Sequence, residues 1–180
     1  MAPRPPFTTA ELNAFDAAYD TSREDSALRT RGEFLAAFPQ NRLRDLTIDS
    51  YVIGHQSPTF CDYVEVKTRD WANIQGATAF KFGIYFGKTK SDRQETYRFT
   101  NKFGNSKEGA FAAVKEALLD LVREGSKSDP DFAAIDDNPL SQLFKAKILS
   151  LYFPDRFLNV CSSEHLELMV AKVGLPDNLR

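Results

Sequence analysis

The sequence predicts an α+β domain in which a small, mainly antiparallel sheet is flanked by helices and keeps one basic, aromatic face open to solvent. Residues 8–40 and 107–174 show the apolar spacing of amphipathic helices, whereas apolar and polar residues alternate in the strand region 60–102. With 180 residues and 42% hydrophobic content, the chain fits a single domain over residues 1–180. A fragment of a longer protein would fit these numbers equally well.

Capping signals place the first two helices. Thr8, followed three residues later by Glu11, forms a capping box and predicts a helix start. A second helix is expected from about Glu24 to Phe38, because Pro39 cannot continue a helix. Residues 40–59 are expected to form a connecting loop.

The middle region is predicted to contain three strands. Residues 60–69 (FCDYVEVKTR), 79–88 (AFKFGIYFGK) and 95–101 (ETYRFTN) alternate between apolar and polar side chains. Their apolar side is expected to pack against the helix of residues 107–124. The predicted core residues of the sheet are Val64, Val66, Phe80, Phe82, Ile84, Phe86 and Phe99.

Helical spacing returns in the last third of the chain. The helix of residues 107–124 is expected to end at Gly125, since glycine is common just beyond helix C-termini. A further helix is predicted to begin with Asn138 as its cap and Pro139 in its first turn. A final helix should open at Ser162 or Ser163 and close at Gly174.

Positive charge is concentrated in one part of the chain, although the net charge is -2. Residues 1–66 carry 6 basic and 10 acidic side chains, and residues 103–180 carry 9 and 12. Residues 67–102 carry 8 basic and 3 acidic side chains. The distribution therefore indicates an anionic partner for the strand region, despite a net charge that argues against a general nucleic-acid binder.

The basic and aromatic residues of the predicted strands indicate that the partner is DNA. Lysine and arginine attract phosphates, and aromatic side chains stack on bases or on flipped nucleotides. Gly83 and Gly87 would let a sugar-phosphate chain approach the backbone closely. The predicted phosphate-binding residues are Lys67, Arg69, Lys81, Lys88, Lys90, Arg93 and Arg98. The predicted stacking or pocket residues are Tyr63, Glu65, Trp71 and Tyr85, with Glu65 accepting a hydrogen bond from a cytosine amino group.

Two other classes of function stay open at this point. Glu65-x-Lys67 on a strand is the arrangement of Mg²⁺-dependent PD-(D/E)xK nucleases, in which the carboxylate binds Mg²⁺ and the lysine lies near the attacking water. Such nucleases also need an acidic residue from a preceding strand, for which Asp49 or Asp62 is available. A protein-interaction module without DNA affinity is the other class, in which the sheet face is only solvated. No catalytic residue, metal site or cofactor is predicted, because His55 and His165 lack partners at ligand spacing and no nucleotide-binding motif is present.

Three stretches of the chain resemble the N-terminal DNA-reading domain of McrB-type AAA+ proteins. They are LTIDSYVIG, TFCDYVEVKTRDWANIQGATAFKFGIYFG and KILSLYFPDRFLNVCSSEHLELMVAKVG, spanning residues 46–174. The resemblance implies a module of a restriction or defence system that reads methylated DNA by base flipping. It also implies an AAA+ GTPase motor in the same polypeptide and a separate nuclease subunit as partners.

The sequence predicts a cytoplasmic protein that does not enter the membrane. Its two cysteines, Cys61 and Cys161, show no CxxC pattern and fit a reducing compartment. No apolar run approaches the 18 residues of a membrane span, and the N-terminus lacks the apolar core of a secretory signal.

Overall fold

The computed structural model describes residues 6–55, 58–74 and 76–174. The chain is 60% helical with a small two-stranded antiparallel sheet, which confirms the α+β class. The elements in chain order are α1 (Thr9–Ala18), α2 (Thr21–Ala37), the 3-10 helix η1 (Gln40–Asp45), α3 (Ile48–Tyr51), α4 (Phe60–Asp62), the π-helical turn η2 (Tyr63–Lys67), α5 (Thr78–Phe82), β1 (Ile84–Gly87), β2 (Thr96–Phe99), the 3-10 helix η3 (Asn101–Phe103), α6 (Lys107–Ser126), α7 (Phe132–Asp137), α8 (Gln142–Tyr152) and α9 (Ser163–Lys172).

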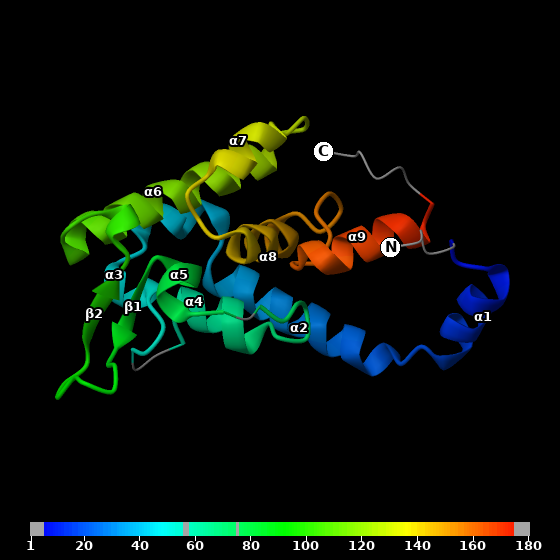
Figure 1. Cartoon of the computed structure of the whole chain (residues 1–180), viewed down its shortest axis with the longest axis horizontal. Helices are drawn as coiled ribbons and strands as arrows, with labels where there is room; N and C mark the ends of the chain where they lie inside the picture. The colour runs from blue at the N-terminus through cyan, green and yellow to red at the C-terminus, as the bar shows by residue number, and fades with distance from the viewer. Residues whose placement is uncertain (1–5, 56–57, 75, 175–180) are drawn as a thin grey trace.

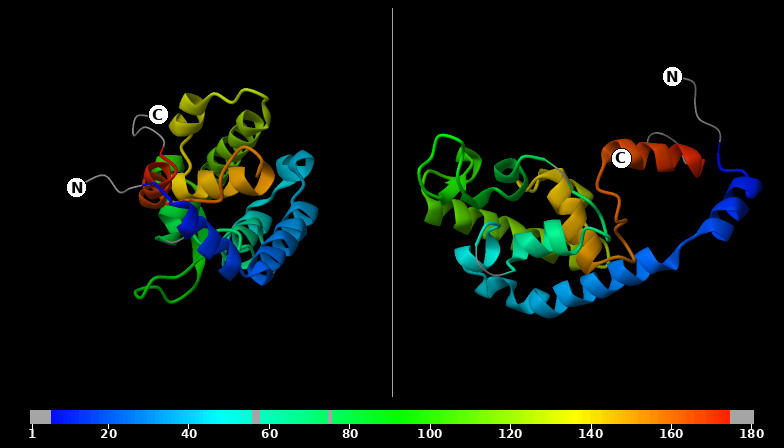
Figure 2. Two further views of the ribbon diagram at one scale, coloured as in Figure 1. Left: turned by 90° about the vertical axis from the view of Figure 1, so that its right-hand side faces the viewer. Right: turned by 90° about the horizontal axis from the view of Figure 1, so that it is seen from below.

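The helices form an elongated body with the sheet at one end and α1 at the other (Figure 1). α6 and α8 lie against each other in the middle, and α2 runs along one side of the body. α1 turns away beyond the start of α2, as both views in Figure 2 show. None of the described helices is both long and apolar enough to cross a bilayer.

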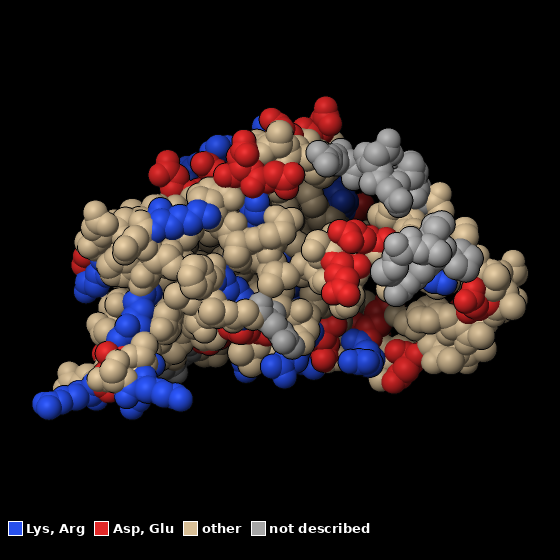
Figure 3. Space-filling view, viewed as in Figure 1, with Lys and Arg blue, Asp and Glu red and all other residues tan. Residues whose placement is uncertain are grey.

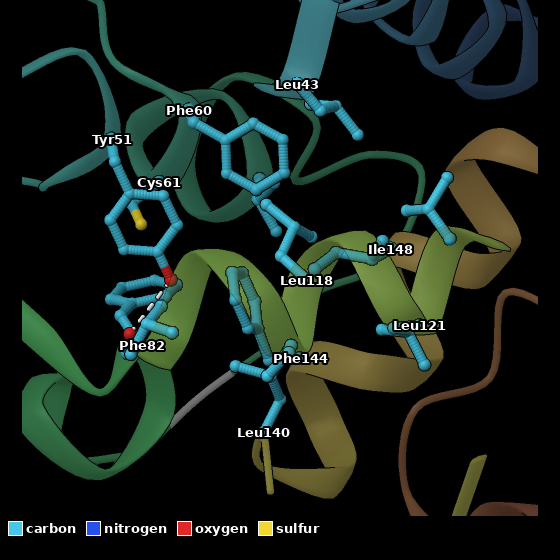
Figure 4. Close-up of a cluster of buried hydrophobic side chains, with 14 of the residues drawn as sticks. Leu43, Tyr51, Phe60, Cys61, Phe82, Leu118, Leu121, Leu140, Phe144 and Ile148 are labelled. Carbon is cyan, nitrogen blue, oxygen red and sulfur yellow. Dashed lines mark hydrogen bonds between the residues drawn. The ribbon is translucent and has the colours of Figure 1, made fainter. Parts of the chain in front are cut away.

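A continuous apolar core joins the middle helices to the short segments around them. Phe60, Phe82 and Phe144 are fully buried, and the ring of Phe144 meets those of Phe60 and Phe82 edge to face. Figure 4 shows these rings beside Leu118 of α6 and Ile148 of α8. The Tyr51 hydroxyl donates a 2.9 Å hydrogen bond to the carbonyl of Phe82, so the core also fixes the end of α5.

Local capping explains most of the helix starts. Thr8 and Glu11 form the expected capping box at α1, and Ser162 caps α9 as predicted. α2 ends at Ala37, close to the expected Pro39 stop. The predicted start of α8 is displaced, because Ser141 is its cap while Asn138 instead binds the Ala117 carbonyl through its side chain.

Gly125 does not end a helix, contrary to the sequence prediction. α6 continues through Gly125 to Ser126. A Cβ at Gly125 would collide with the side chain of Leu149 and come within 2.9 Å of the Phe153 ring. The glycine therefore allows α8 to pack closely against α6.

Residues 60–69 form a helical segment, so the strand predicted there is wrong. Thr59 and Asp62 make a capping box that starts α4, with the Thr59 amide donating to Asp62 at 3.0 Å. The chain continues as the π-helical turn η2, which closes where the Thr68 hydroxyl donates to the Tyr63 carbonyl at 2.8 Å. Val66 consequently lies 54% exposed instead of in the core, while Val64 is buried as predicted.

The stretch of residues 79–88 spans a junction between a helix and a strand. Its first part belongs to α5, and Gly83 ends this helix with a φ of 77° before β1 begins. Phe80 points outward from α5 and is 77% exposed, so its predicted place in the core is wrong. Phe82 and Ile84 are fully buried as predicted. The residues 40–59 also differ from the expected loop, since they include η1 and α3.

Candidate nucleic-acid interface

The two strands form a hairpin with one apolar face and one polar face, on which the side chains of Tyr85 and Arg98 are half-buried. Ile84 pairs with Phe99, and Phe86 pairs with Tyr97, on the side that packs against the core. Tyr85 pairs with Arg98 on the opposite side, with Gly87 and Thr96 beyond them. The hairpin therefore places Tyr85 and Arg98 side by side on one face, as the alternation predicted.

Asp92 organises the loop between the strands. Its Oδ2 accepts hydrogen bonds from the Thr89 amide at 2.6 Å and from the Thr89 hydroxyl at 2.7 Å. The Arg98 guanidinium donates to the same oxygen. The hydrogen bonds from Thr89, and to a smaller degree the Arg98 charge, lower the pKa of Asp92. The Asp92 carboxylate therefore gives the loop a defined shape and at the same time forms an ion pair with Arg98.

The apolar face of the hairpin is anchored by the segment that precedes α4. The Phe86 amide donates to the Ile53 carbonyl at 3.0 Å, and a Cβ on Gly54 would collide with the Phe86 carbonyl. The Tyr97 hydroxyl donates to Asp49 and lies 3.3 Å from His55 Nε2. Burial and the Asp49 carboxylate raise the pKa of Tyr97 to about 12. These contacts fix the base of the hairpin and leave its loop projecting.

Three cations project from the loop. Lys88, Lys90 and Arg93 are exposed, and none of them forms an ion pair with a described residue. We call these three residues the basic tip. Figure 3 shows lysine and arginine side chains extending from the hairpin at the lower left of the molecule. The geometry thus presents positive charge on a narrow ribbon that a large anion can reach.

No family model matches the chain. No curated protein and no solved structure matches it either. The resemblance to McrB-type reading domains stays a prediction. What the basic tip can bind therefore follows from its own charges and shape.

Lys81 lies in the interior, so its predicted place on the open face is wrong. Its side chain is 3% exposed and forms an ion pair with Glu65, whose side chain is 24% exposed. The backbone carbonyl of Lys81 accepts a 3.0 Å hydrogen bond from the Ser141 hydroxyl. Because α5 is a helix rather than a strand, the Lys81 side chain faces inward. Its ammonium group pairs with the Glu65 carboxylate, so Glu65 is not free to bind a base.

The other two aromatic candidates lie away from the hairpin. Tyr63 is half-buried, with its ring centroid 5.6 Å from that of Phe38, which follows α2. Trp71 is half-buried and donates a 3.1 Å hydrogen bond from Nε1 to the Ser150 hydroxyl in α8. The structure therefore does not bring together the four predicted pocket residues, and only Tyr85 lies on the hairpin.

Lys67 and Arg69 are exposed at the end of η2, which packs against α2. They do not belong to the hairpin, so the predicted phosphate surface is divided between two elements. Glu65 and Lys67 also lie on a helical turn, and the strand geometry on which the nuclease hypothesis depended is wrong. The nuclease hypothesis also required carboxylates close enough to hold a metal ion. Within residues 6–55, 58–74 and 76–174, no group of three His, Cys, Asp or Glu side chains lies close enough together to hold one.

Sequence reasoning missed the residues that shape the hairpin. Thr89 and Asp92 stand three residues apart, a spacing typical of a local side-chain cap, and this signal could have identified the ordered loop. Asp49 and His55 lie 48 and 42 residues from Tyr97, and no local pattern links them.

Gly83 has a structural role in place of the predicted contact with DNA. Its Cβ would lie 2.6 Å from Val114 Cγ2 and 2.8 Å from Phe103 Cε2. The residue is therefore a glycine because α6 and η3 pack against it. Gly87 is different, since among the described residues a Cβ added there would come close to the ring of Tyr85 alone, at 3.1 Å.

Proposed function

We propose that the chain binds DNA through the β-hairpin of residues 84–99. The observation that carries the proposal is the basic tip, a group of cations that has no ion-pair partner among the described residues and projects on an anchored ribbon. Phosphate contacts supply most of the affinity of proteins for DNA. A two-stranded β-ribbon also fits the major groove of B-DNA.

The ordered loop supports this proposal. Because Asp92 binds both Thr89 and Arg98, the loop loses little conformational freedom when it binds. Arg98 is already engaged by Asp92, so its contribution to phosphate binding is smaller than that of the basic tip. Tyr85, beside Arg98 on the polar side of the hairpin, is half-buried and could contact a base or a sugar with the exposed part of its ring.

Recognition of a modified base is the second part of the proposal. It depends on the resemblance to McrB-type reading domains, as do a role in restriction or defence and the AAA+ motor and nuclease partners. Only Tyr85 among the four pocket candidates lies on the hairpin. Discrimination between methylated and unmodified cytosine would therefore depend on Tyr85 and not on a pocket made by all four side chains.

Fluorescence anisotropy with labelled duplexes tests both parts. The wild-type protein is titrated against one duplex in unmodified, methylated and hydroxymethylated form. The hairpin variant combines Lys88→Gln, Lys90→Gln and Arg93→Gln, and we expect it to bind at least about tenfold more weakly at low salt, since three phosphate contacts are lost. Equal affinity for the three duplexes would refute the modified-base proposal and leave simple DNA binding intact.

A matched variant controls for loss of positive charge alone. It combines Arg29→Gln, Arg42→Gln and Arg44→Gln, three exposed cations outside the hairpin, of which Arg29 forms a surface ion pair with Glu33 at 3.0 Å. Arg44 lies in a surface depression formed by η1 and the C-terminal half of α6. The control variant should keep most of the wild-type affinity. If both variants weaken binding equally, the hairpin is not the DNA-binding surface.

A further inference from the structure

A groove of about 620 Å³ lies at the opposite end of the molecule from the hairpin. It runs between the end of α1, the first half of α2 and the segment of residues 154–159 that follows α8. Figure 2 shows this segment descending toward α2. We call it the aromatic groove, and its apolar lining includes Phe15, Tyr19, Leu28, Trp71, Phe157 and Leu158.

The apolar side chains of the groove are unusually exposed. Phe15 is 66% exposed, Leu28 49% and Leu158 60%. They come from three separate elements but line the same depression. Isolated exposed apolar residues are common on protein surfaces, whereas a contiguous concave group marks a binding surface.

Trp71 is held in a fixed position at this groove. Its indole nitrogen donates to Ser150 of α8, and the Arg31 guanidinium lies 5.4 Å from the ring centroid. Its carbonyl accepts a 2.9 Å hydrogen bond from the Asn159 side chain, which ties the segment of residues 154–159 to it. A large, rigid aromatic ring of this kind is a typical anchor point in a protein interface.

The rim of the groove carries excess negative charge. Asp20, Glu24 and Asp70 line it, and Arg23 is the one cation among the described lining residues, while Arg31 lies over the Trp71 ring. None of the three carboxylates forms an ion pair within the described ranges. Their hydrogen-bond donors are neutral groups: the Ser22 amide binds Asp20, the Tyr19 hydroxyl binds Glu24 at 3.0 Å, and the Ser26 hydroxyl binds Asp70 at 2.8 Å.

We propose that the aromatic groove binds a short amphipathic peptide segment of a partner protein, with an apolar face flanked by lysine or arginine. The apolar lining accounts for affinity, because burying such side chains is favourable. The three carboxylates outnumber Arg23 in the lining and therefore favour basic over acidic partners. This inference is independent of the DNA proposal, since no residue of the hairpin lines the groove, and α1, which borders it, lies at the opposite end of the molecule from the sheet (Figure 1).

Trp71 is the only tryptophan of the protein and reports directly on the groove. The probe is a 14-residue helical peptide of leucine and lysine with one apolar face. Two matched peptides replace lysine by glutamate, or leucine by serine. We expect the leucine-lysine peptide alone to shift the Trp71 emission and to bind with saturation. Binding of the leucine-glutamate peptide with equal affinity would contradict the acidic selection, and binding by none of the peptides would overturn the proposal.

A pair of variants locates the binding site. Leu28→Glu introduces a charge on the exposed side of α2 inside the groove, whereas Val66→Glu does so at a comparably exposed apolar residue outside it. We expect at least a tenfold loss of peptide affinity for Leu28→Glu and little change for Val66→Glu. Equal affinities of the two variants would overturn the proposal. Light scattering tests whether a second copy of the chain occupies the groove. If wild type is a dimer and Leu28→Glu is a monomer, the groove is a dimer interface and the peptide proposal is overturned.

Discussion

Lys81 and Glu65 form an ion pair across two helical segments that the sequence presents as strands. The two side chains are buried to different degrees. The Lys81 side chain is 3% exposed and that of Glu65 is 24% exposed. Removing Glu65 and removing Lys81 should therefore change the free energy of unfolding by different amounts.

Glu65→Leu should destabilise the protein by about 3 to 5 kcal/mol, because it leaves the Lys81 ammonium buried without its counter-charge. Lys81→Met should cost less, since the remaining Glu65 carboxylate can reach water. Urea unfolding followed by circular dichroism measures both. The exposed neighbour Lys67→Ala is the control and should change the free energy of unfolding by less than about 0.5 kcal/mol. A larger loss for Lys81→Met than for Glu65→Leu would contradict the assigned burial.

The buried Lys147 is expected to make the free energy of unfolding rise with pH. The side chain is fully buried in α8 and donates to the carbonyls of Thr68 and Ala72. Burial lowers the pKa of Lys147 from 10.5 to about 8. Between pH 8 and 10.5 the unfolded chain binds a proton that the folded chain has released, so the free energy of unfolding increases with pH in this window.

The comparison with Lys147→Met isolates this effect. Burial raises the pKa of Cys61 in wild type and variant alike, which lowers stability as the unfolded thiol ionises near pH 9. Burial also raises the pKa of Cys161, which the Lys147 charge opposes, so Cys161 is replaced by alanine in both proteins for this comparison. Wild type should gain about 2 kcal/mol over the variant between pH 7.5 and 9.5. Urea unfolding at several pH values measures the difference. A difference that does not depend on pH would show that the Lys147 pKa is not lowered.

Gly54 should tolerate no side chain. Its φ is 99°, and an added Cβ would collide with the backbone carbonyl of Phe86. Gly54→Ala is therefore expected to lower the free energy of unfolding by at least about 1 to 3 kcal/mol and to loosen the base of the hairpin.

Gly32→Ala is the matched control for this substitution. Gly32 lies within α2, and a Cβ added there would meet no neighbouring atom within 4 Å, so alanine should stabilise the helix by about 0.5 to 1 kcal/mol. Thermal unfolding of the two variants checks the opposite signs. A neutral Gly54→Ala would mean that the segment before α4 is not docked on β1.

Local signals in the sequence predicted much of the fold. The caps at Thr8 and Ser162 and the alternation of β2 depend on residues close together in the chain, and the structure confirms these elements. The segments around Val66 and Phe80 were assigned wrongly, because a short helix can show the same apolar alternation as a strand. The Thr59 capping box starts a helix at Phe60, and Gly83, with its positive φ, ends the helix that contains Phe80.

The candidate site was predicted only in part. Lys88, Lys90 and Arg93 follow β1 directly, so a hairpin between the two strands was enough to place them together. The positions of Lys81 and Trp71 depend on contacts with Glu65 and Ser150, which lie 16 and 79 residues away in the sequence. Such contacts arise from tertiary packing, and the local pattern around either residue carries no sign of them.

The salt dependence of DNA binding tests the central claim most directly. The logarithm of the binding constant is measured against the logarithm of salt concentration for wild type and for the variant that lacks the three charges of the basic tip. Each phosphate contact contributes about 0.9 to the slope, so the variant slope should be smaller in magnitude by about 2 to 3. Identical slopes for the two proteins would contradict DNA binding through the hairpin.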